Sequence, residues 1–188
     1  MPRRLGEIAV PQDPISASAW QFARRTLPAY LFDHSVRSYC WAAAIAAREG
    51  LAFEPRLLWP ASLMHDVGLT RIGRSRACFE YDGADVARRF VLRQGMSPLD
   101  ADVVARAIVL HMAPSVTEAD GAEAVLLDRA TALDVRGVRA DLVADVRGPI
   151  DAAHPRGAFD RLFRAAIQRE VALRTDCQSA RLLARLGS

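Results

Sequence analysis

Lysine and asparagine are absent from the sequence, so all 25 basic residues are arginines. These arginines are interspersed with acidic residues, as in GADVARRF (83–90), and form neither a basic stripe nor a cluster with exposed aromatic residues. The net charge is only +3. Nucleic-acid binding needs a concentrated basic surface. The sequence therefore predicts a solvated surface and no nucleic-acid partner.

Long apolar runs are missing as well. The longest uncharged apolar stretch in the first half of the chain, YCWAAAIAA (39–47), is far shorter than the roughly 20 residues of a membrane-spanning helix. The first residues, MPRRLGEIAVPQDP, contain no apolar core of a secretory signal. We therefore expect a cytoplasmic protein with no membrane partner.

Cysteine is scarce. Cys40, Cys78 and Cys177 are odd in number and widely spaced, a pattern that predicts reduced thiols rather than disulfides or cysteine-bound zinc. The 188 residues include 51% hydrophobic and 25% charged residues, a composition typical of a folded soluble protein. The length favours one domain with a real core.

Helical periodicity fills most of the chain. Pro28 and Gly50 are natural helix boundaries, Ser97 is a capping residue followed by Pro98, and Pro60 is expected to bend or shorten its helix. Alternating strand patterns are not evident, so we predict an all-α fold. Residues 69–83 are the least regular and are expected to form an ordered loop. The predicted helices cover 16–26, 34–50, 54–68, 82–95, 97–112, 121–137, roughly 156–174, and 176–186.

Histidines mark the ends of three predicted helices. His34 opens one helix, His65 and Asp66 end the apolar run LLWPASLMHDVGL (57–69), and His111 closes a third. Burying an imidazole and a carboxylate without partners is costly. Antiparallel packing could bring these helix ends together, and imidazole nitrogens with carboxylate oxygens suit zinc or ferrous iron.

Simpler interpretations of the same residues stay open at this point. A single histidine on a helix is more often a hydrogen-bonded core residue than a ligand, and a single aspartate is more often a cap or a surface charge. These alternatives apply to His34 and to Asp134, which falls in the last turn of its helix. His154, in AAHPRG, is interpreted as a surface loop residue.

The ordered set of segments resembles the HD-domain superfamily, and within it the cyanamide hydratase-like proteins. The resemblance rests on the pattern His34, His65–Asp66 and Asp134, and it spans roughly residues 20–160. It implies a single HD-type helical bundle over 1–188, with an HD core at about 20–160 and C-terminal helices (156–187) packed on it. The segments that carry it are DHSVRSYCWAAAIA (33–46), LMHDVGLT (63–70), SRACFEYDGADVA (75–87), DADVVARAIVLHM (100–112) and ATALDVRG (130–137).

The resemblance implies one divalent metal ion, with zinc as the first choice and ferrous or manganous ions as alternatives. Its ligands would be His34, His65, Asp66 and Asp134. Asp128 competes for the last place, but only Asp134 lies in the A-T-x-x-D-x-x-G frame.

The resemblance also implies roles beyond the metal. His111 would either lie beside the metal ligands and support them or be a catalytic residue, together with Asp66. For each of the remaining candidates a plain packing or ion-pair role is about as good an interpretation. The candidate substrate-binding residues are Arg37, Arg76, Phe79 and Glu80.

The implied activity is the addition of water to a small nitrile-like nitrogen compound, with cyanamide to urea as the model. Asp33 and MAPSV (112–116) depart from the family pattern and leave the substrate open.

The alternative is a phosphohydrolase acting on a nucleotide or small phosphate ester. No acidic residue lies between Asp66 and Glu80, which argues against a phosphohydrolase. The arginines of RIGRSR (71–76), by contrast, could bind phosphate. A metal-stabilised scaffold ranks third. The expected partner is a small-molecule substrate, and a homo-oligomer is left open.

Overall fold

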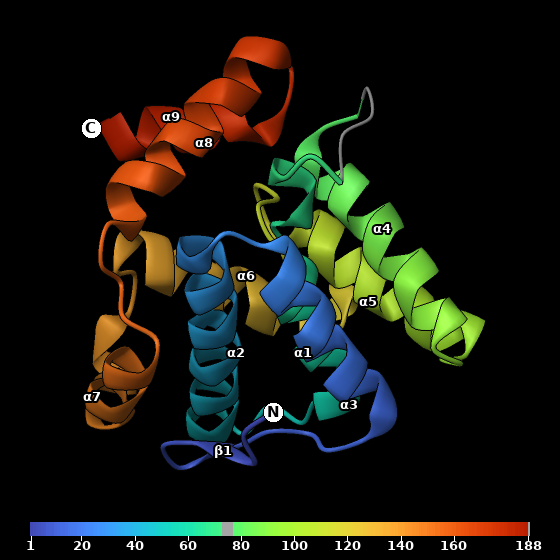
Figure 1. The fold of residues 1–188 in the computed structure, drawn as a ribbon. Coiled ribbons are helices and arrows are strands. Elements are labelled where there is room, and N and C mark those ends of the chain that lie inside the picture. The colour runs from blue at the N-terminus through green and yellow to red at the C-terminus, as the bar shows by residue number, and fades with distance from the viewer. Residues whose placement is uncertain (73–76, 188) are drawn as a thin grey trace.

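Helices make up most of the structure, a computed structural model that describes residues 1–72 and 77–187, with side chains to residue 184 (Figure 1). The all-α prediction is confirmed. In chain order the described helices are α1 (Pro14–Thr26), α2 (Ala29–Glu49), α3 (Pro55–Met64), α4 (Phe79–Arg93), α5 (Pro98–Leu110), α6 (Ala122–Arg136), α7 (Ala144–Ala153), α8 (Phe159–Leu173) and α9 (Gln178–Gly187).

Short elements that the sequence pattern did not predict complete the fold. Strands β1 (Arg4–Leu5) and β2 (Ile8–Ala9) form a small antiparallel hairpin. Helix α7 contains Gly148 and Pro149, residues that favour turns. The apolar pattern of the sequence therefore did not indicate this short helix. Single 3₁₀ turns lie at η1 (Val67–Leu69), η2 (Glu118–Asp120) and η3 (Ala140–Val143).

Helix α2 runs through the centre and contacts α1, α3, α6, α7 and α8 (Figure 1). It begins at Ala29, five residues earlier than predicted, because Pro28 serves as the residue before the first turn rather than as a barrier. His34 therefore lies inside the helix, in its second turn. Val36, Cys40 and Trp41 are among the fully buried side chains of α2.

Several helix ends follow the sequence signals. Gly50 ends α2 and Gly137 ends α6, both in the left-handed conformation (φ 68° and 70°) that glycine adopts without strain. The Ser97 side chain accepts a hydrogen bond from the Asp100 amide at 3.1 Å and begins α5. Helix α1 begins at Pro14, two residues earlier than predicted, and Asp13 caps it.

The segment after α3 is shorter in regular helix than predicted. Helix α3, with Pro60 inside it, ends at Met64, and His65 and Asp66 lead into the 3₁₀ turn η1. Gly68 in this turn packs against the start of α4. A Cβ atom there would lie 1.9 Å from the Phe79 carbonyl oxygen, so only glycine allows this approach.

The prediction of reduced thiols is wrong for two of the three cysteines. Cys78, just before α4, and Cys177, just before α9, form a disulfide with their Cα atoms 5.5 Å apart. The two residues are 99 positions apart in the chain, so no local spacing could reveal the pair. Cys40 is free and buried. Within the described ranges, no helix is both long and apolar enough to cross a bilayer.

Candidate metal centre and catalytic pocket

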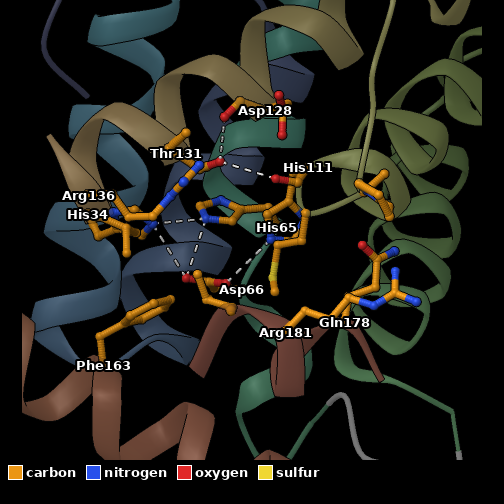
Figure 2. A pocket seen from close by; sticks show the side chains of 16 residues that line it. His34, His65, Asp66, His111, Asp128, Thr131, Arg136, Phe163, Gln178 and Arg181 are labelled. Atoms are coloured by element: carbon orange, nitrogen blue, oxygen red, sulfur yellow. Dashed lines mark hydrogen bonds and ion pairs between the residues drawn. The ribbon is translucent and has the colours of Figure 1, made fainter. Parts of the chain in front are cut away.

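Three histidines and one aspartate meet where several helix ends converge (Figure 2). His34 comes from the second turn of α2, His65 and Asp66 follow α3, and His111 follows α5. All four side chains are at least 96% buried, with exposed fractions of 4% or less. The predicted meeting of these helix ends is confirmed.

Each of the three imidazoles is oriented by a bond at its Nδ1 atom. His34 Nδ1 lies 2.7 Å from Asp134 Oδ2, His65 Nδ1 lies 2.7 Å from the Ser62 carbonyl, and His111 Nδ1 lies 2.5 Å from the Ile108 carbonyl. Carbonyl and carboxylate oxygens only accept hydrogen bonds, so Nδ1 carries the proton in each ring. The three Nε2 atoms are left as lone-pair donors.

These lone pairs converge. His34 Nε2 lies 3.1 Å from His65 Nε2, and Asp66 Oδ2 lies 3.6 Å and 3.4 Å from these two atoms. Two imidazole lone pairs facing each other at this distance repel each other unless a proton or a metal ion lies between them. Asp66 Oδ2 is buried without a hydrogen-bond partner among the described residues. Such an orphaned oxygen is costly unless a cation satisfies it.

Local charges reinforce this arrangement. Burial alone would raise the pKa of Asp66, but His65 and His34 beside it lower the pKa to about 2. Burial would likewise lower the pKa of His65, yet the Asp66 carboxylate outweighs it and raises that pKa. Burial lowers the pKa of His111 to about 4, and the charge of His65 acts in the same direction. The Asp66 carboxylate thus stays ionised and favours a positive charge beside it.

Asp134 lies on the other side of the His34 ring. Its Oδ2 accepts hydrogen bonds from His34 Nδ1 and from Arg37 Nη2, both at 2.7 Å. Its Oδ1 accepts from Arg37 Nε at 2.9 Å and from Trp41 Nε1 at 2.7 Å. Burial would raise the pKa of Asp134, but the hydrogen bonds from Arg37 and His34 hold it far below its usual range. Among the described residues, the donor atoms that converge within 4.8 Å belong to His34, His65 and Asp66, without Asp134.

A cavity of about 60 Å³ lies over the cluster. Figure 2 shows the four clustered side chains on one side, with Gln178 and Arg181 from α9 facing them across it. Helix α8 contributes Phe163, so the two C-terminal helices complete the pocket. The remaining described lining residues are Met112, Ala113, Pro114, Asp128, Thr131, Ala132, Val135, Arg136 and Leu182.

The three candidate substrate-binding residues that the structure describes are not among the residues that line this cavity. Arg37 is fully buried and binds Asp134. The Phe79 ring packs edge-on against His111, with centroids 5.8 Å apart. Glu80 is fully buried, and neither of its oxygens has a hydrogen-bond partner in the described part of the chain. Arg76 lies outside the described residues.

Some contributors were not found from the sequence. Gln178 and Arg181 are one turn apart on an amphipathic helix, a pattern too common to mark a site. The interpretation of His154 as a surface residue is wrong: only 8% of it is exposed, and its Nδ1 lies 2.9 Å from Asp33 Oδ1. Its carbonyl accepts a hydrogen bond from Arg37 Nη1 at 3.1 Å, which connects the segment before α8 to the centre.

Comparison with known proteins identifies the fold. The family model described as HD domain matches residues 31–136, more than half of the chain. The chain belongs to the HD domain family. Among its relatives are the cyanamide hydratases DDI2 and DDI3 of Saccharomyces cerevisiae. Each is 26% identical over 175 residues, which cover 90% of this chain and 78% of the relative.

The residues of this HD domain fit a divalent metal ion. Two neutral imidazole nitrogens and one ionised carboxylate oxygen form a donor set that zinc and similar ions accept. The convergence of these three donor atoms, together with the unpartnered Oδ2 of Asp66, is the observation that supports the fit. The chain is therefore equipped as a metal-dependent HD enzyme.

Proposed function

We propose that this HD protein adds water to a small nitrile-type compound, with cyanamide to urea as the model reaction. The cyanamide hydratase relatives support this substrate class. The single observation that carries the proposal is the small size of the cavity over the metal cluster.

The cavity volume limits the substrate to a few heavy atoms. A cavity of about 60 Å³ has room for roughly four waters, because one water needs about 15 Å³ on this scale. The N–C≡N skeleton of cyanamide fits such a space. A nucleotide is many times larger and would extend well beyond this cavity.

Protein groups position the reactants around this space. A divalent ion held by His34, His65 and Asp66 would supply Lewis acidity that lowers the pKa of a bound water towards neutrality. His111 directs Nε2 into the same region, 4.0 Å from Asp66 Oδ1. Its Nδ1–H donates to the Ile108 carbonyl, which keeps Nε2 free to accept a proton.

In the proposed reaction the water oxygen forms a bond to the nitrile carbon, and one carbon–nitrogen π bond breaks. His111 Nε2 accepts the proton that the water loses and delivers it to the nitrile nitrogen. Tautomerisation then gives urea from cyanamide. No oxidant, reductant or second substrate is consumed.

A phosphohydrolase remains the second candidate because Arg136 and Arg181 both line the pocket. Arginine binds phosphate well through paired donors. The test is metal analysis of the purified chain, followed by assays for urea from cyanamide and for inorganic phosphate from a panel of small phosphate esters. Urea formation supports the hydratase, whereas phosphate release without urea formation overturns it.

A His111→Ala variant tests the proton-transfer role. We expect it to retain one metal ion per chain and to lose about 10²–10⁴-fold in turnover, the usual contribution of a positioned acid or base. His154→Ala is the matched control, because it removes another buried histidine outside the cavity and should leave turnover per folded molecule nearly unchanged. Loss of the metal from His111→Ala would make His111 a ligand instead.

A further inference from the structure

The four hydrogen bonds to Asp134 use all the capacity of its carboxylate. A carboxylate has about four lone-pair sites. Two lie on Oδ1, bonded to Arg37 Nε and Trp41 Nε1, and two lie on Oδ2, bonded to Arg37 Nη2 and His34 Nδ1. Asp66 Oδ2, by contrast, has no hydrogen bond within the described residues. The two carboxylates are thus prepared for different partners.

The position of Asp134 also separates it from the cation site. It contacts His34 at Nδ1, whereas His65 faces His34 at Nε2. The two nitrogens point in different directions from the ring, so a cation bound at Nε2 lies away from the Asp134 carboxylate. Arg156 adds a further positive group to Asp134, 3.5 Å from Oδ2.

We propose that Asp134 is not a metal ligand in this chain but a positioning residue, which fixes the proton of His34 on Nδ1 and directs Nε2 to the metal. Arg37 and Trp41 hold the carboxylate in place for this purpose. Residues that orient a ligand in this way typically contribute 10–100-fold to metal affinity. The inference rests on the metal centre of the proposed function, but not on its substrate.

The number of histidines makes a direct test practical. The chain has only four, so the ring signals of a ¹⁵N-histidine-labelled sample are few. The His34 Nδ1–H proton can be assigned through its proximity to the Phe159 ring, whose centroid lies 4.7 Å from that of His34. Spectra are recorded on the full chain, first without metal and then with one equivalent of zinc.

We expect the hydrogen-bonded His34 Nδ1–H signal in both spectra. Its disappearance on zinc binding would show that Asp134 leaves His34 for the metal, and would overturn the inference while leaving the metal centre intact. Failure of the wild-type chain to bind zinc would instead overturn the proposed function as well. These spectra need no substitution, so they decide the question even if a variant fails to fold.

Asp134→Asn then measures the effect on affinity. We expect it to bind one zinc ion at saturation, with a dissociation constant 10–100-fold higher in a chelator competition. The cobalt-loaded variant should keep the visible absorption pattern of the wild-type chain, because the ligand set is unchanged. Wild-type affinity, or an altered cobalt spectrum, would contradict the positioning role.

Discussion

The two nitrogens of His34 face environments of opposite character. Behind the ring, at Nδ1, every polar group of the Asp134 network has a partner inside the protein. In front, at Nε2, unprotonated nitrogens converge with an orphaned carboxylate oxygen. Both regions are buried to a similar degree. The two regions therefore differ not in burial but in the number of hydrogen-bond donors that the protein provides.

This difference separates folding from function. A buried charge is tolerated when hydrogen bonds and opposite charges satisfy it, and the Asp134 side meets that condition within the chain. The Asp66 side does not meet it and depends on a cation from outside. We therefore expect substitutions in front to remove metal and activity, and substitutions behind to reduce stability first.

The largest effect on metal binding is expected in front, from Asp66→Asn. The amide keeps the shape but removes the charge that faces His34 and His65. We expect zinc affinity to fall by more than about 100-fold, beyond the range for outer residues, and urea formation to fall to background. Metal content and circular dichroism would be measured together. Asp128→Asn is the control, and a comparable loss of metal there would identify Asp128 as a ligand.

On the Asp134 side of the His34 ring, we expect Arg37→Met to have a smaller effect on metal affinity and a large effect on stability. The change removes both Arg37 hydrogen bonds from the buried Asp134 carboxylate and leaves only the more distant Arg156 as an opposite charge, which should cost about 3–5 kcal/mol of unfolding free energy. Urea unfolding of the metal-free chain measures it. Arg88→Met breaks the exposed pair with Asp102, whose side chains are 41% and 58% exposed, and should cost at most about 1 kcal/mol. Equal costs in the two variants would refute the distinction between the two regions.

The smallest effect concerns Glu80, a buried carboxylate whose oxygens have no hydrogen-bond partner within the described residues. Burial raises its pKa, and the nearby Glu170 adds to this. Since the folded state holds the proton more tightly than the unfolded one, stability decreases as the pH rises from the ordinary glutamate value through the folded pKa.

Glu80→Gln removes this penalty. The variant should be more stable than the wild-type chain by roughly 1 kcal/mol at about pH 7 and equal to it at about pH 4. Urea unfolding of the metal-free chain at the two pH values gives the comparison. The exposed residue Glu118 offers the control, since Glu118→Gln should give no such pH dependence. A gain that is the same at both pH values would exclude titration as its cause.

Local signals account for most of the helices. Periodic apolar positions, Gly50 and Gly137 at helix ends, and Ser97 at a helix start are properties of adjacent residues, which a sequence displays directly. The meeting of His34, His65 and His111 was predictable for a related reason, because each of them lies near one end of its helix.

Long-range geometry was not predictable. Helical spacing places Arg37 one turn from His34, and the family resemblance implies that Asp134 lies close by, but neither says which ring nitrogen Asp134 contacts. The Cys78–Cys177 disulfide and the Asp33–His154 pair depend on how the C-terminal helices fold back over the core. The disulfide also does not favour the cytoplasmic location, which stays a prediction.

The order in which the pocket is completed follows from the place of α9 in the chain. During synthesis, His34, His65 and Asp66 leave the ribosome long before Gln178 and Arg181, which cover them. The metal-binding side chains can thus encounter metal ions before the residues of α9 cover them. The disulfide between Cys78 and Cys177 then holds the start of α9 beside α4. Helix α9 therefore covers a metal site that can already contain its ion.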